Sequence, residues 1–316
     1  MGEYFLGVDG GQSSTTAWIG DAGGRVIGRG TAGPCNHVGA AEGRAKFLNA
    51  LNGCIGKACA EAGLDPAAIS FEAACLGFSG GPADKEALVR EMVRVKELLV
   101  SHDALIALVG ATDGQPGVIV IAGTGSIAFG RNAAGRTARA GGWGYVFGDE
   151  GGAFDLVRQA LRAALRYEEG WGPPTAIHRL LLDATGAASA NELMHRFYTD
   201  EYPRSRVASY ARLLGGAATL GDSVALELLK QAGGQLAALA GAVRGQLFAP
   251  GEAARVSYIG GVFKNPYVLD RYRTLVELEE GNRSGPPLHG PAAGALIEAY
   301  RAGGRTVRLR PAETGG

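Results

Sequence analysis

The fold is decided first by the stretch Tyr4-Phe-Leu-Gly-Val-Asp-Gly-Gly-Gln-Ser-Ser-Thr-Thr-Ala-Trp-Ile19, in which two short apolar runs flank a glycine-rich turn. The runs predict strands over 4–8 and 15–19. Two later segments have the same character, Ile121-Ala-Gly-Thr-Gly-Ser126 and Ser257-Tyr-Ile-Gly-Gly-Val262. A strand that ends in glycine leaves backbone N–H groups accessible to phosphate oxygens, because no side chain blocks the approach. Three such turns predict a nucleotide bound from several sides.

The pattern continues outward from the first turn as alternating strands and helices. We expect a third strand over 25–30, a helix over 41–62 and a strand over 71–78. The first helix ends at Gly63, with Pro66 beyond it as a stop signal. A second helical pattern covers 85–99. The first 112 residues therefore predict the order βββαβα.

A second three-strand pattern follows Asp113-Gly-Gln-Pro-Gly117, with strands expected over 118–122, 126–130 and 137–140. Helical patterns then dominate 152–230, with helices over 153–167, 189–197 and 223–248. A strand over 256–259 and a helix over 291–301 complete the pattern. A repeated three-strand unit is typical of a duplicated α/β architecture with a cleft between the halves. We expect domains over 1–112 and 113–290, and a loose polar tail over 304–316.

Composition limits the kind of partner. The chain has 316 residues, and its 31 Lys plus Arg balance its 31 Asp plus Glu. This neutrality gives no basic surface for nucleic acid and no signal for a membrane surface, so we expect a small-molecule substrate. The start carries no secretory leader, and no apolar stretch approaches the roughly 20 residues of a bilayer span, which predicts a cytoplasmic protein. The four cysteines lack zinc spacing and are expected to be reduced and buried.

Several motifs together resemble the N-acetylglucosamine kinases of the BadF/BadG/BcrA/BcrD ATPase family, within the superfamily of actin-like ATPases, sugar kinases and heat-shock chaperones. The resemblance covers about residues 4–299, and its most specific element is Gly141-Gly-Trp-Gly-Tyr-Val-Phe-Gly-Asp-Glu-Gly151. It implies an α/β fold of two actin-like (ribonuclease H-like) domains with a nucleotide cleft between them. A helix over about 291–303 would pack back on the first domain. The implied activity is ATP-dependent phosphorylation of the 6-hydroxyl of N-acetylglucosamine or a related amino sugar, and we expect a homodimer.

The first turn supplies a candidate metal ligand. Asp9 ends a predicted strand, where a carboxylate can hold Mg²⁺ beside the β- and γ-phosphates. The alternative is a turn aspartate that bonds its own backbone. The predicted ATP contacts are glycines and small polar residues of the three turns, namely Gly10, Gly11, Gln12, Ser13, Gly123, Thr124, Gly260 and Gly261. The last two resemble the adenosine turn of the family, although a helix-entry turn explains them as well.

Phosphorylation of a hydroxyl needs a carboxylate that accepts its proton. The resemblance implies Asp103, in Ser101-His-Asp-Ala104, as this catalytic base. The alternative role for Asp103 is an N-cap of the following helix. Asp113 is a second candidate base, but its Asp-Gly-Gln-Pro-Gly setting favours a solvent turn.

Sugar recognition requires amides, hydroxyls and carboxylates that bond paired hydroxyls. Asp149 and Glu150 could instead cap a helix that begins near Gly152, and Trp143 is more typical of core packing. Val38-Gly39 stands where many relatives carry a bulky aromatic residue, so glucosamine and muramic-type sugars stay open as acceptors. The resemblance implies sugar contacts from Asn36, Ser79, Asp103, Thr124, Gly125 and Asp149.

Two other functions compete with that of a sugar kinase. An ATP-driven electron-transfer activator of the same group would ligate an iron–sulfur cluster through cysteines beyond the second phosphate turn, but no cysteine follows Cys75. A nucleotide-dependent sugar sensor without kinase activity stays open, because the sequence does not show whether Asp103 is positioned as a base. An ATPase assay with a panel of sugars separates the sensor from the kinase.

Overall fold

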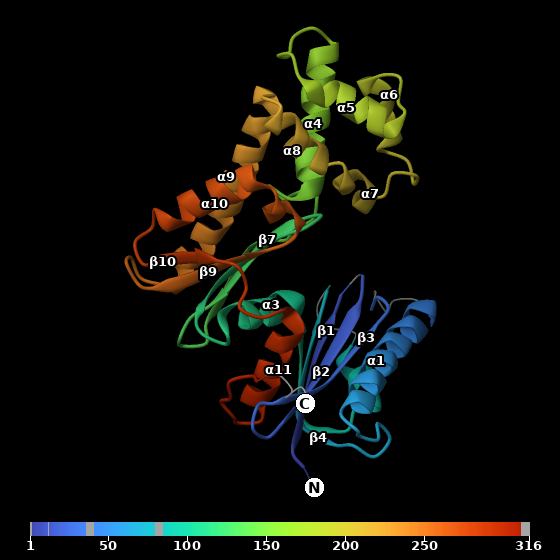
Figure 1. The fold of residues 1–316 in the computed structure, drawn as a ribbon, viewed down its shortest axis with the longest axis vertical. Coiled ribbons are helices and arrows are strands. Elements are labelled where there is room, and N and C mark those ends of the chain that lie inside the picture. Colours follow the sequence, from blue (N-terminus) through green and yellow to red (C-terminus); the bar gives the residue numbers. More distant parts are fainter. Residues whose placement is uncertain (1, 12, 36–40, 80–84, 311–316) are drawn as a thin grey trace, which may run out of the picture. The chain divides into compact units, whose positions relative to one another are not determined.

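The computed structural model describes residues 2–11, 13–35, 41–79 and 85–310, and the chain divides into two units (Figure 1). Unit 1 comprises Met1–Gln115 with Pro287–Gly316, and unit 2 comprises Pro116–Pro286. Each unit contains one five-stranded sheet with helices packed on it. Unit 1 is discontinuous in sequence, whereas unit 2 is a single continuous segment.

The sheet of unit 1 has the strand order β3-β2-β1-β4-β5. The first hairpins pair antiparallel, whereas β1, β4 and β5 run parallel to one another. The carboxyl ends of these three parallel strands therefore share one edge of the sheet, the position at which open α/β sheets usually bind ligands. The strands are β1 (Tyr4–Gly10), β2 (Thr15–Asp21), β3 (Val26–Ala32), β4 (Phe71–Phe78) and β5 (Val95–His102).

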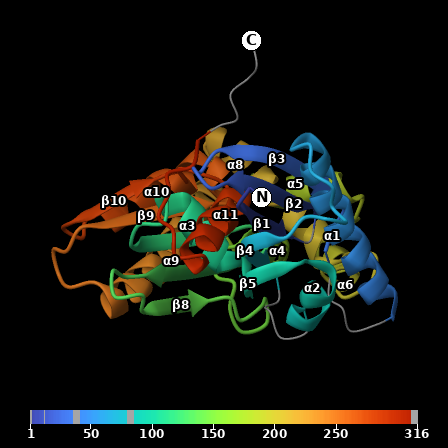
Figure 2. The same cartoon turned by 90° about the horizontal axis from the view of Figure 1, so that it is seen from below.

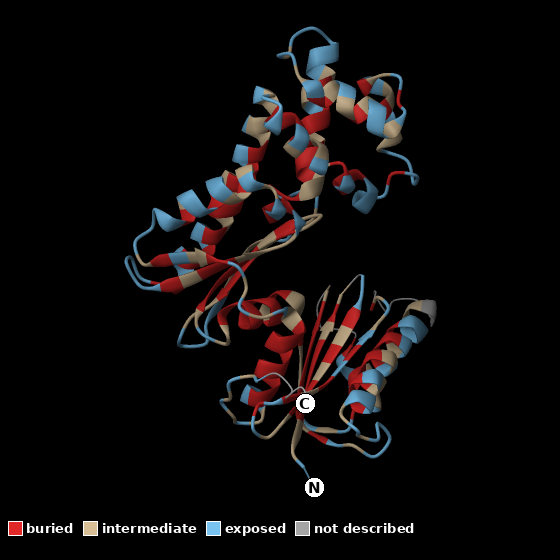
Figure 3. Ribbon diagram, viewed as in Figure 1, coloured by how far each residue is buried: buried red, intermediate tan, exposed pale blue. Residues whose placement is uncertain are grey.

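Both faces of this sheet are covered by helices. Leu6 and Val8 belong to the core beneath α1 (Ala41–Glu61), whereas Phe5 points to the other face, where α11 (Pro291–Ala302) packs. Figure 1 shows α1 and α11 on opposite sides of the sheet, and Figure 3 shows the strands between them as largely buried. A strand buried on both faces is apolar along its whole length, which explains the apolar run from Tyr4 to Val8.

Helix α11 crosses α3 (Asp103–Thr112) with the two backbones in direct contact. A Cβ atom on Gly294 would lie 1.9 Å from the carbonyl oxygen of Ile106, and one on Gly110 would lie 2.4 Å from that of Gly290. Only glycine fits at such distances. The crossing joins residues that are almost 190 positions apart in the chain (Ile106 and Gly294) and fixes the late helix on unit 1.

The sheet of unit 2 has the order β10-β9-β6-β7-β8, and β9 and β10 run side by side at one edge (Figure 2). Its strands are β6 (Gly117–Ala122), β7 (Ser126–Arg131), β8 (Thr137–Gly141), β9 (Ala254–Ile259) and β10 (Asn282–Gly285). Helix α9 (Ser223–Leu247) packs on the sheet and on α10 (Pro266–Glu277). The remaining helices of unit 2 form a helical part that shares the same core, namely α4 (Ala153–Glu168), α5 (Ala176–Thr185), α6 (Ala190–Arg196), α7 (Arg204–Ser209) and α8 (Arg212–Thr219).

The predicted helix over 85–99 is wrong in its second half. The chain forms α2 (Glu86–Met92) and then β5, with α2 lying beside β5 (Figure 2). The first part of the chain is therefore βββαβαβα. Apolar residues at Leu88, Met92, Val95 and Leu99 keep helical spacing across the boundary, but parallel pairing of β5 with β4 overrides that local pattern.

The predicted loose tail over 304–316 is wrong for its described part, 304–310. The backbone N–H of Arg310 donates to the carbonyl of Gly24 at 2.9 Å, and the N–H of Val26 donates to the carbonyl of Arg310 at 3.0 Å. Val307 and Leu309 pack against the core on the α11 face. The chain is thus bound to unit 1 as far as Arg310, and 311–316 lie outside the described residues. Strand β10 and helix α10 were not individually predicted.

Candidate active site

The carboxyl edge of the unit 1 sheet gathers three of the predicted site residues. Asp9 of β1 pairs in register with Gly77 of β4, and Phe78 of β4 pairs with His102 of β5. Ser79 and Asp103 come one position after these two strand ends. The backbone N–H of Ser79 donates to the carbonyl of Gly10 at 3.2 Å, which ties the β4 end to the first glycine turn. Parallel pairing therefore brings Asp9, Ser79 and Asp103 to one place.

The two carboxyl groups influence each other. Burial, and secondarily the negative charge of Asp103, raises the pKa of Asp9 to about 6. Burial also raises the pKa of Asp103, while the Ala104 N–H, the His102 ring and the Ser79 hydroxyl act in the opposite direction. A pair of partly dehydrated carboxylates creates a strong negative potential. Such a place favours either a bound cation or a proton.

Asp103 is not the N-cap of α3. His102 occupies that position, and its ring Nδ1 accepts the backbone N–H of Leu105 at 3.2 Å. Asp103 is the first residue of the helix, where the helix dipole stabilises a carboxylate. The capping role that competed with catalysis is filled by another residue, so the Asp103 carboxylate is available for chemistry.

The first glycine turn is closed by a hydrogen bond from the Gly11 N–H to the Ser14 carbonyl at 3.0 Å. Ser13 is exposed beside it. No hydrogen bond to the Asp9 carboxylate is found among the residues that the structure describes, so they do not support the turn-aspartate alternative. Gln12 and Asn36, both predicted site residues, lie outside the described residues.

The second glycine turn, in unit 2, is held by a helix and is not an ordinary hairpin turn. The carbonyls of Gly123 and Thr124 accept the backbone N–H groups of Ala153 and Phe154 at 2.9 and 3.0 Å, at the start of α4. Nothing lies within 4 Å of the place where a Cβ atom on Gly123 would stand. The turn therefore presents uncovered backbone on its outer side.

A cavity of about 470 Å³ lies against this turn, entirely within unit 2. Gly123 and Gly261 both line it, as do the cationic side chains of Arg212 and Lys264. The cavity joins two of the three glycine turns with positive charge, a combination suited to a nucleotide. Its remaining lining includes Ala153, Leu156, Ala211, Gly215, Asn265 and Tyr267.

Gly260 can only be glycine. Its φ is +120°, and a Cβ atom there would lie 2.1 Å from the carbonyl oxygen of Ala122. This close approach sets the end of β9 against the end of β6 and leaves Gly261 with open space at its Cβ position. Gly260 also precedes the short 3₁₀ helix Gly261–Lys264, so the helix-entry and ligand-approach interpretations hold together.

Asp149 is buried, and each of its two carboxylate oxygens accepts a hydrogen bond inside unit 2. Its Oδ1 accepts the N–H of Ser126 at 3.3 Å, and its Oδ2 accepts Nη2 of Arg204 at 2.9 Å. A Cβ atom on Gly125 would lie 2.4 Å from Oδ2, which explains the glycine there. Arg204 was not predicted as a site residue, because it lies 55 residues from Asp149 and belongs to no motif.

The helix-capping alternative for Asp149 and Glu150 is wrong. The N-cap of α4 is Gly152, and the carboxylate that serves this helix start belongs to Asp155, whose Oδ2 accepts the Gly151 N–H at 3.1 Å. The core-packing interpretation of Trp143 is also wrong. Its side chain is 66% exposed, with the Arg139 guanidinium 4.4 Å from the ring centre.

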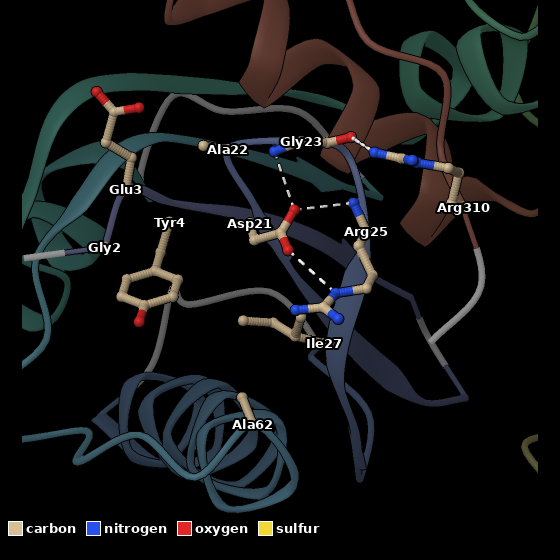
Figure 4. A pocket seen from close by; sticks show the side chains of 10 residues that line it. All are labelled: Gly2, Glu3, Tyr4, Asp21, Ala22, Gly23, Arg25, Ile27, Ala62 and Arg310. Carbon is tan, nitrogen blue, oxygen red and sulfur yellow. Dashed lines mark hydrogen bonds and ion pairs between the residues drawn. The ribbon is translucent and has the colours of Figure 1, made fainter. Parts of the chain in front are cut away.

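Another cavity, of about 610 Å³, lies at the opposite end of β1 (Figure 4). Two acidic residues line it, Glu3 and Asp21. Asp21 accepts hydrogen bonds from the Gly23 and Arg25 N–H groups and from Nε of Arg25. Arg310 donates to the Gly23 carbonyl on the same rim. Glu3 pairs with Arg305. Both carboxylates of this cavity are therefore engaged by the protein, and it offers no chemistry comparable with the Asp9 edge.

Over 2–11, 13–35, 41–79 and 85–310, no group of three or more His, Cys, Asp or Glu side chains is placed to hold a metal ion. The four cysteines all lie among the described residues, where they are buried, as predicted, and form no disulfide. Asp113 faces His289 at 3.4 Å at the end of α3. Within the described part of the chain, every helix is too short or too polar to cross a bilayer.

Comparison with known proteins agrees with this geometry. Two α/β units, each built on a five-stranded sheet with glycine turns at its strand ends, define the class of actin-like sugar kinases. Residues 6–299 match the BadF/BadG/BcrA/BcrD ATPase family, and the chain belongs to it. The predicted fold class and family are confirmed.

Three relatives illustrate the family. The chain is 31% identical to an N-acetylmuramic acid/N-acetylglucosamine kinase of Clostridium acetobutylicum, over 87% of this chain and 91% of that one. It is 30% identical to an N-acetyl-D-glucosamine kinase of Dictyostelium discoideum, over 74% and 77%. The solved structure of a candidate N-acetylglucosamine kinase from Chromobacterium violaceum is similar with a TM-score of 0.72 and 26% identity, covering 93% of this chain and 98% of that one.

Proposed function

We propose that this protein is an ATP-dependent kinase that phosphorylates the 6-hydroxyl of N-acetylglucosamine or a closely related amino sugar. One observation carries the proposal: Asp9, Ser79 and Asp103 meet at the carboxyl edge of the unit 1 sheet. The names of two family relatives, which describe N-acetylglucosamine kinases, support the choice of acceptor.

Asp103 is the proposed catalytic base. Its carboxylate accepts the proton of the sugar hydroxyl while that oxygen forms a bond to the γ-phosphorus. The bond from the γ-phosphorus to the bridging oxygen breaks, and ADP leaves. Burial raises its pKa, which strengthens it as a proton acceptor, while the Ser79 hydroxyl donates to it and fixes its orientation. Ser79 is thus a positioning residue and a second contact for the sugar.

Asp9 is the proposed metal-side carboxylate. The pair Asp9 and Asp103 fits a divalent cation, because a positive ion offsets both causes of the raised pKa of Asp9, which are its burial and, secondarily, the charge of Asp103. Mg²⁺ keeps most of its water and binds through one or two carboxylates plus phosphate oxygens, so a larger acidic cluster is not needed. When bound, Mg²⁺ neutralises charge on the β- and γ-phosphates.

The proposed nucleotide contacts are backbone groups of the three glycine turns. Gly10, Gly11 and Ser13 lie in unit 1, and Gln12 completes that turn in the sequence. In unit 2, Gly123, Thr124, Gly260 and Gly261 border or adjoin the 470 Å³ cavity, which suits an adenosine group.

The proposed sugar contacts in unit 2 are Thr124, Gly125 and Asp149, with Asn36 and Ser79 contributing from unit 1. Arg204 already pairs with Asp149 at 2.9 Å. An ammonium group on the sugar therefore gains less from that carboxylate, which favours a neutral N-acetyl sugar over glucosamine.

A coupled ADP-release assay tests the function. With MgATP we expect kcat/KM to be highest for N-acetylglucosamine, lower for glucosamine and lower still for glucose, because a pocket polar group left unpaired costs about 1–3 kcal/mol. Product NMR identifies the phosphorylated hydroxyl. ADP release unchanged by every sugar, together with sugar binding in calorimetry, would instead support the nucleotide-dependent sensor.

Two wider expectations extend the proposal. Because the donor is ATP, we place the protein in the cytoplasm, and because of the family resemblance we propose a homodimer. Light scattering on the purified protein measures the molar mass directly, and a mass near the 32.5 kDa of one chain contradicts the dimer.

A further inference from the structure

A cavity of about 740 Å³ lies in unit 2, and one of its lining residues, Arg204, pairs with Asp149. Its lining contains three arginines, Arg158, Arg162 and Arg204, and no aspartate or glutamate. The rest of the lining is apolar or aromatic, with few polar side chains. A cationic cavity with apolar walls suits an organic anion, since the guanidinium groups bind a carboxylate and the walls cover its carbon skeleton.

Arg204 links this cavity to the proposed sugar site. Its Nη2 donates to Asp149 at 2.9 Å, while its guanidinium carbon lies 4.7 Å from the ring centre of Tyr145 and 5.9 Å from that of Phe154. These two rings pack edge to face at 5.1 Å. The side chain is thus held by an ion pair and two aromatic rings, at the boundary between Asp149 and the cavity.

Arg204 has donor capacity left for a ligand. Its guanidinium carries five N–H donors. Among the described residues, Arg204 donates one hydrogen bond, to Asp149. Its side chain is 42% exposed, whereas that of Asp149 is 8% exposed. The remaining N–H groups of the Arg204 guanidinium can therefore donate hydrogen bonds to a second anion while the ion pair with Asp149 is kept.

The other two arginines differ in their engagement. Arg158 is committed to the protein, because it donates to the Tyr145 carbonyl at 3.0 Å and to Asp155 at 2.6 Å. Arg162 makes a single long hydrogen bond, at 3.4 Å, to Gln159 in the described structure. Arg204 and Arg162 are consequently the groups able to bind an anion. Leu161, Leu165 and Phe197 form part of the apolar wall of the cavity.

We infer that this cavity is a subsite for a carboxylate-bearing substituent on the amino-sugar ring, and that Arg204 determines whether such a sugar is accepted. The inference rests on the proposed function, because it takes Asp149 as a sugar contact. A sugar bonded to Asp149 places its substituents within reach of the group that holds Asp149. The substrate class is an N-acetylhexosamine carrying a carboxyalkyl ether.

The experiment compares three sugars in four proteins. The sugars are N-acetylglucosamine, N-acetylmuramic acid and the methyl ester of N-acetylmuramic acid, which keeps the shape and removes the charge. The proteins are wild type, Arg204→Gln, Arg204→Lys and Arg206→Gln. Arg206 is the matched control, since it lies on the same short helix α7 and donates instead to the Glu201 carbonyl. Thermal unfolding verifies that each variant is folded.

Arg204→Gln should lower kcat/KM for N-acetylmuramic acid by about 10- to 100-fold more than for N-acetylglucosamine, the scale of one charge-assisted hydrogen bond. The loss should appear in KM, because the substituent is remote from the reacting hydroxyl. Arg204→Lys should restore much of it, and Arg206→Gln should leave the ratio unchanged. The methyl ester should be insensitive to Arg204.

Calorimetry of N-acetylmuramic acid binding, without nucleotide, separates this inference from the proposed function. Binding that Arg204→Gln weakens and Arg206→Gln does not supports the subsite even if no sugar is phosphorylated. Absence of binding by wild type overturns the subsite even if N-acetylglucosamine is a good substrate. An equal loss for both sugars in Arg204→Gln also overturns it, because Arg204 would then act only by holding Asp149.

Discussion

Asp9 and Asp103 lie at the same edge of one sheet but differ in what surrounds them. The Ala104 N–H, His102 and Ser79 favour the charged form of Asp103 and so act against the rise of its pKa. The two causes given for the pKa of Asp9, burial and the charge of Asp103, both raise it. A carboxylate that has such hydrogen-bond and charge partners is stable in its deprotonated, basic form. A buried carboxylate that lacks them is stabilised in that form by a bound cation. This difference supports the proposal of Asp103 as the base and of Asp9 as the metal-side carboxylate.

Asp103→Asn should lower kcat by about 10²- to 10⁴-fold, because it removes the proton acceptor. Helix α3 should be unaffected, since His102 supplies the cap. Steady-state kinetics with N-acetylglucosamine measures the effect. The matched control is Asp113→Asn, which removes the competing candidate base; a loss in Asp113→Asn as large as in Asp103→Asn would place the base at the other aspartate.

The raised pKa of Asp9 makes stability depend on pH. Its pKa is 3.8 ordinarily and about 6 in the folded protein, so the folded state favours the protonated form. The stabilisation is full below pH 3.8 and is lost as the pH rises through about 6. Without Mg²⁺, the free energy of unfolding of Asp9→Asn relative to wild type should rise by about 1–3 kcal/mol across this interval.

Denaturant unfolding of wild type and Asp9→Asn at several pH values measures this difference. The analogous comparison with Asp113→Asn serves as the control. A constant offset between Asp9→Asn and wild type from pH 4 to 7 would show that the Asp9 carboxyl titrates as it does in the unfolded chain.

Motifs predicted the residues of the unit 1 edge, and their roles stay predictions. Asp9, Ser79 and Asp103 each follow a strand, so a residue-by-residue reading could select them. Arg204 could not be found this way. Its relation to Asp149 depends on how α7 folds back, and no spacing rule links positions 55 residues apart.

At the scale of elements, the crossing of α3 and α11 leaves no space for a side chain larger than that of glycine at Gly294. Gly294→Ala should lower the free energy of unfolding by about 1–3 kcal/mol or more, because the new methyl group would stand 1.9 Å from the Ile106 carbonyl and force the helices apart. Gly56→Ala is the matched control, since nothing lies within 4 Å of its added methyl group. That change should stabilise α1 by about 0.5–1 kcal/mol.

Urea unfolding followed by circular dichroism measures both changes. Equal stability of Gly294→Ala and wild type would mean that the helix crossing can loosen without cost, contrary to the packing described here.

The elements that the sequence predicted well are those whose pattern is local. Helix α1 and strands β1, β4 and β6 have apolar periodicity and a stop signal within their own residues. Strand β5 does not, because it borders the sheet and its Lys96 and Glu97 side chains are exposed. Its identity depends on pairing with β4, which a local pattern does not contain.

At the scale of the whole molecule, unit 1 is built from two segments that are far apart in the sequence. Local sequence patterns do not predict this discontinuity. Residues 116–286 form one continuous unit, so this segment expressed alone should fold, with a cooperative thermal transition. Residues 1–115 alone should not, since they lack α11 and leave Phe5, Ala73 and Ile106 uncovered. Circular dichroism and amide dispersion in NMR spectra decide both cases, and a cooperatively folded 1–115 fragment would show that α11 is dispensable.

The same discontinuity sets an order of events on the ribosome. Residues 1–115 emerge first, yet one face of their sheet is completed only when 287–316 have been synthesised. Unit 2 can reach its folded state during that interval, so the later-made unit matures before the earlier one, against the usual N-to-C order. Over the time needed to translate about 170 residues at about 5–20 residues per second, roughly 10–35 s, the nascent chain exposes an apolar sheet face. That interval is when a chaperone that holds apolar surface would have most effect on the yield of this protein.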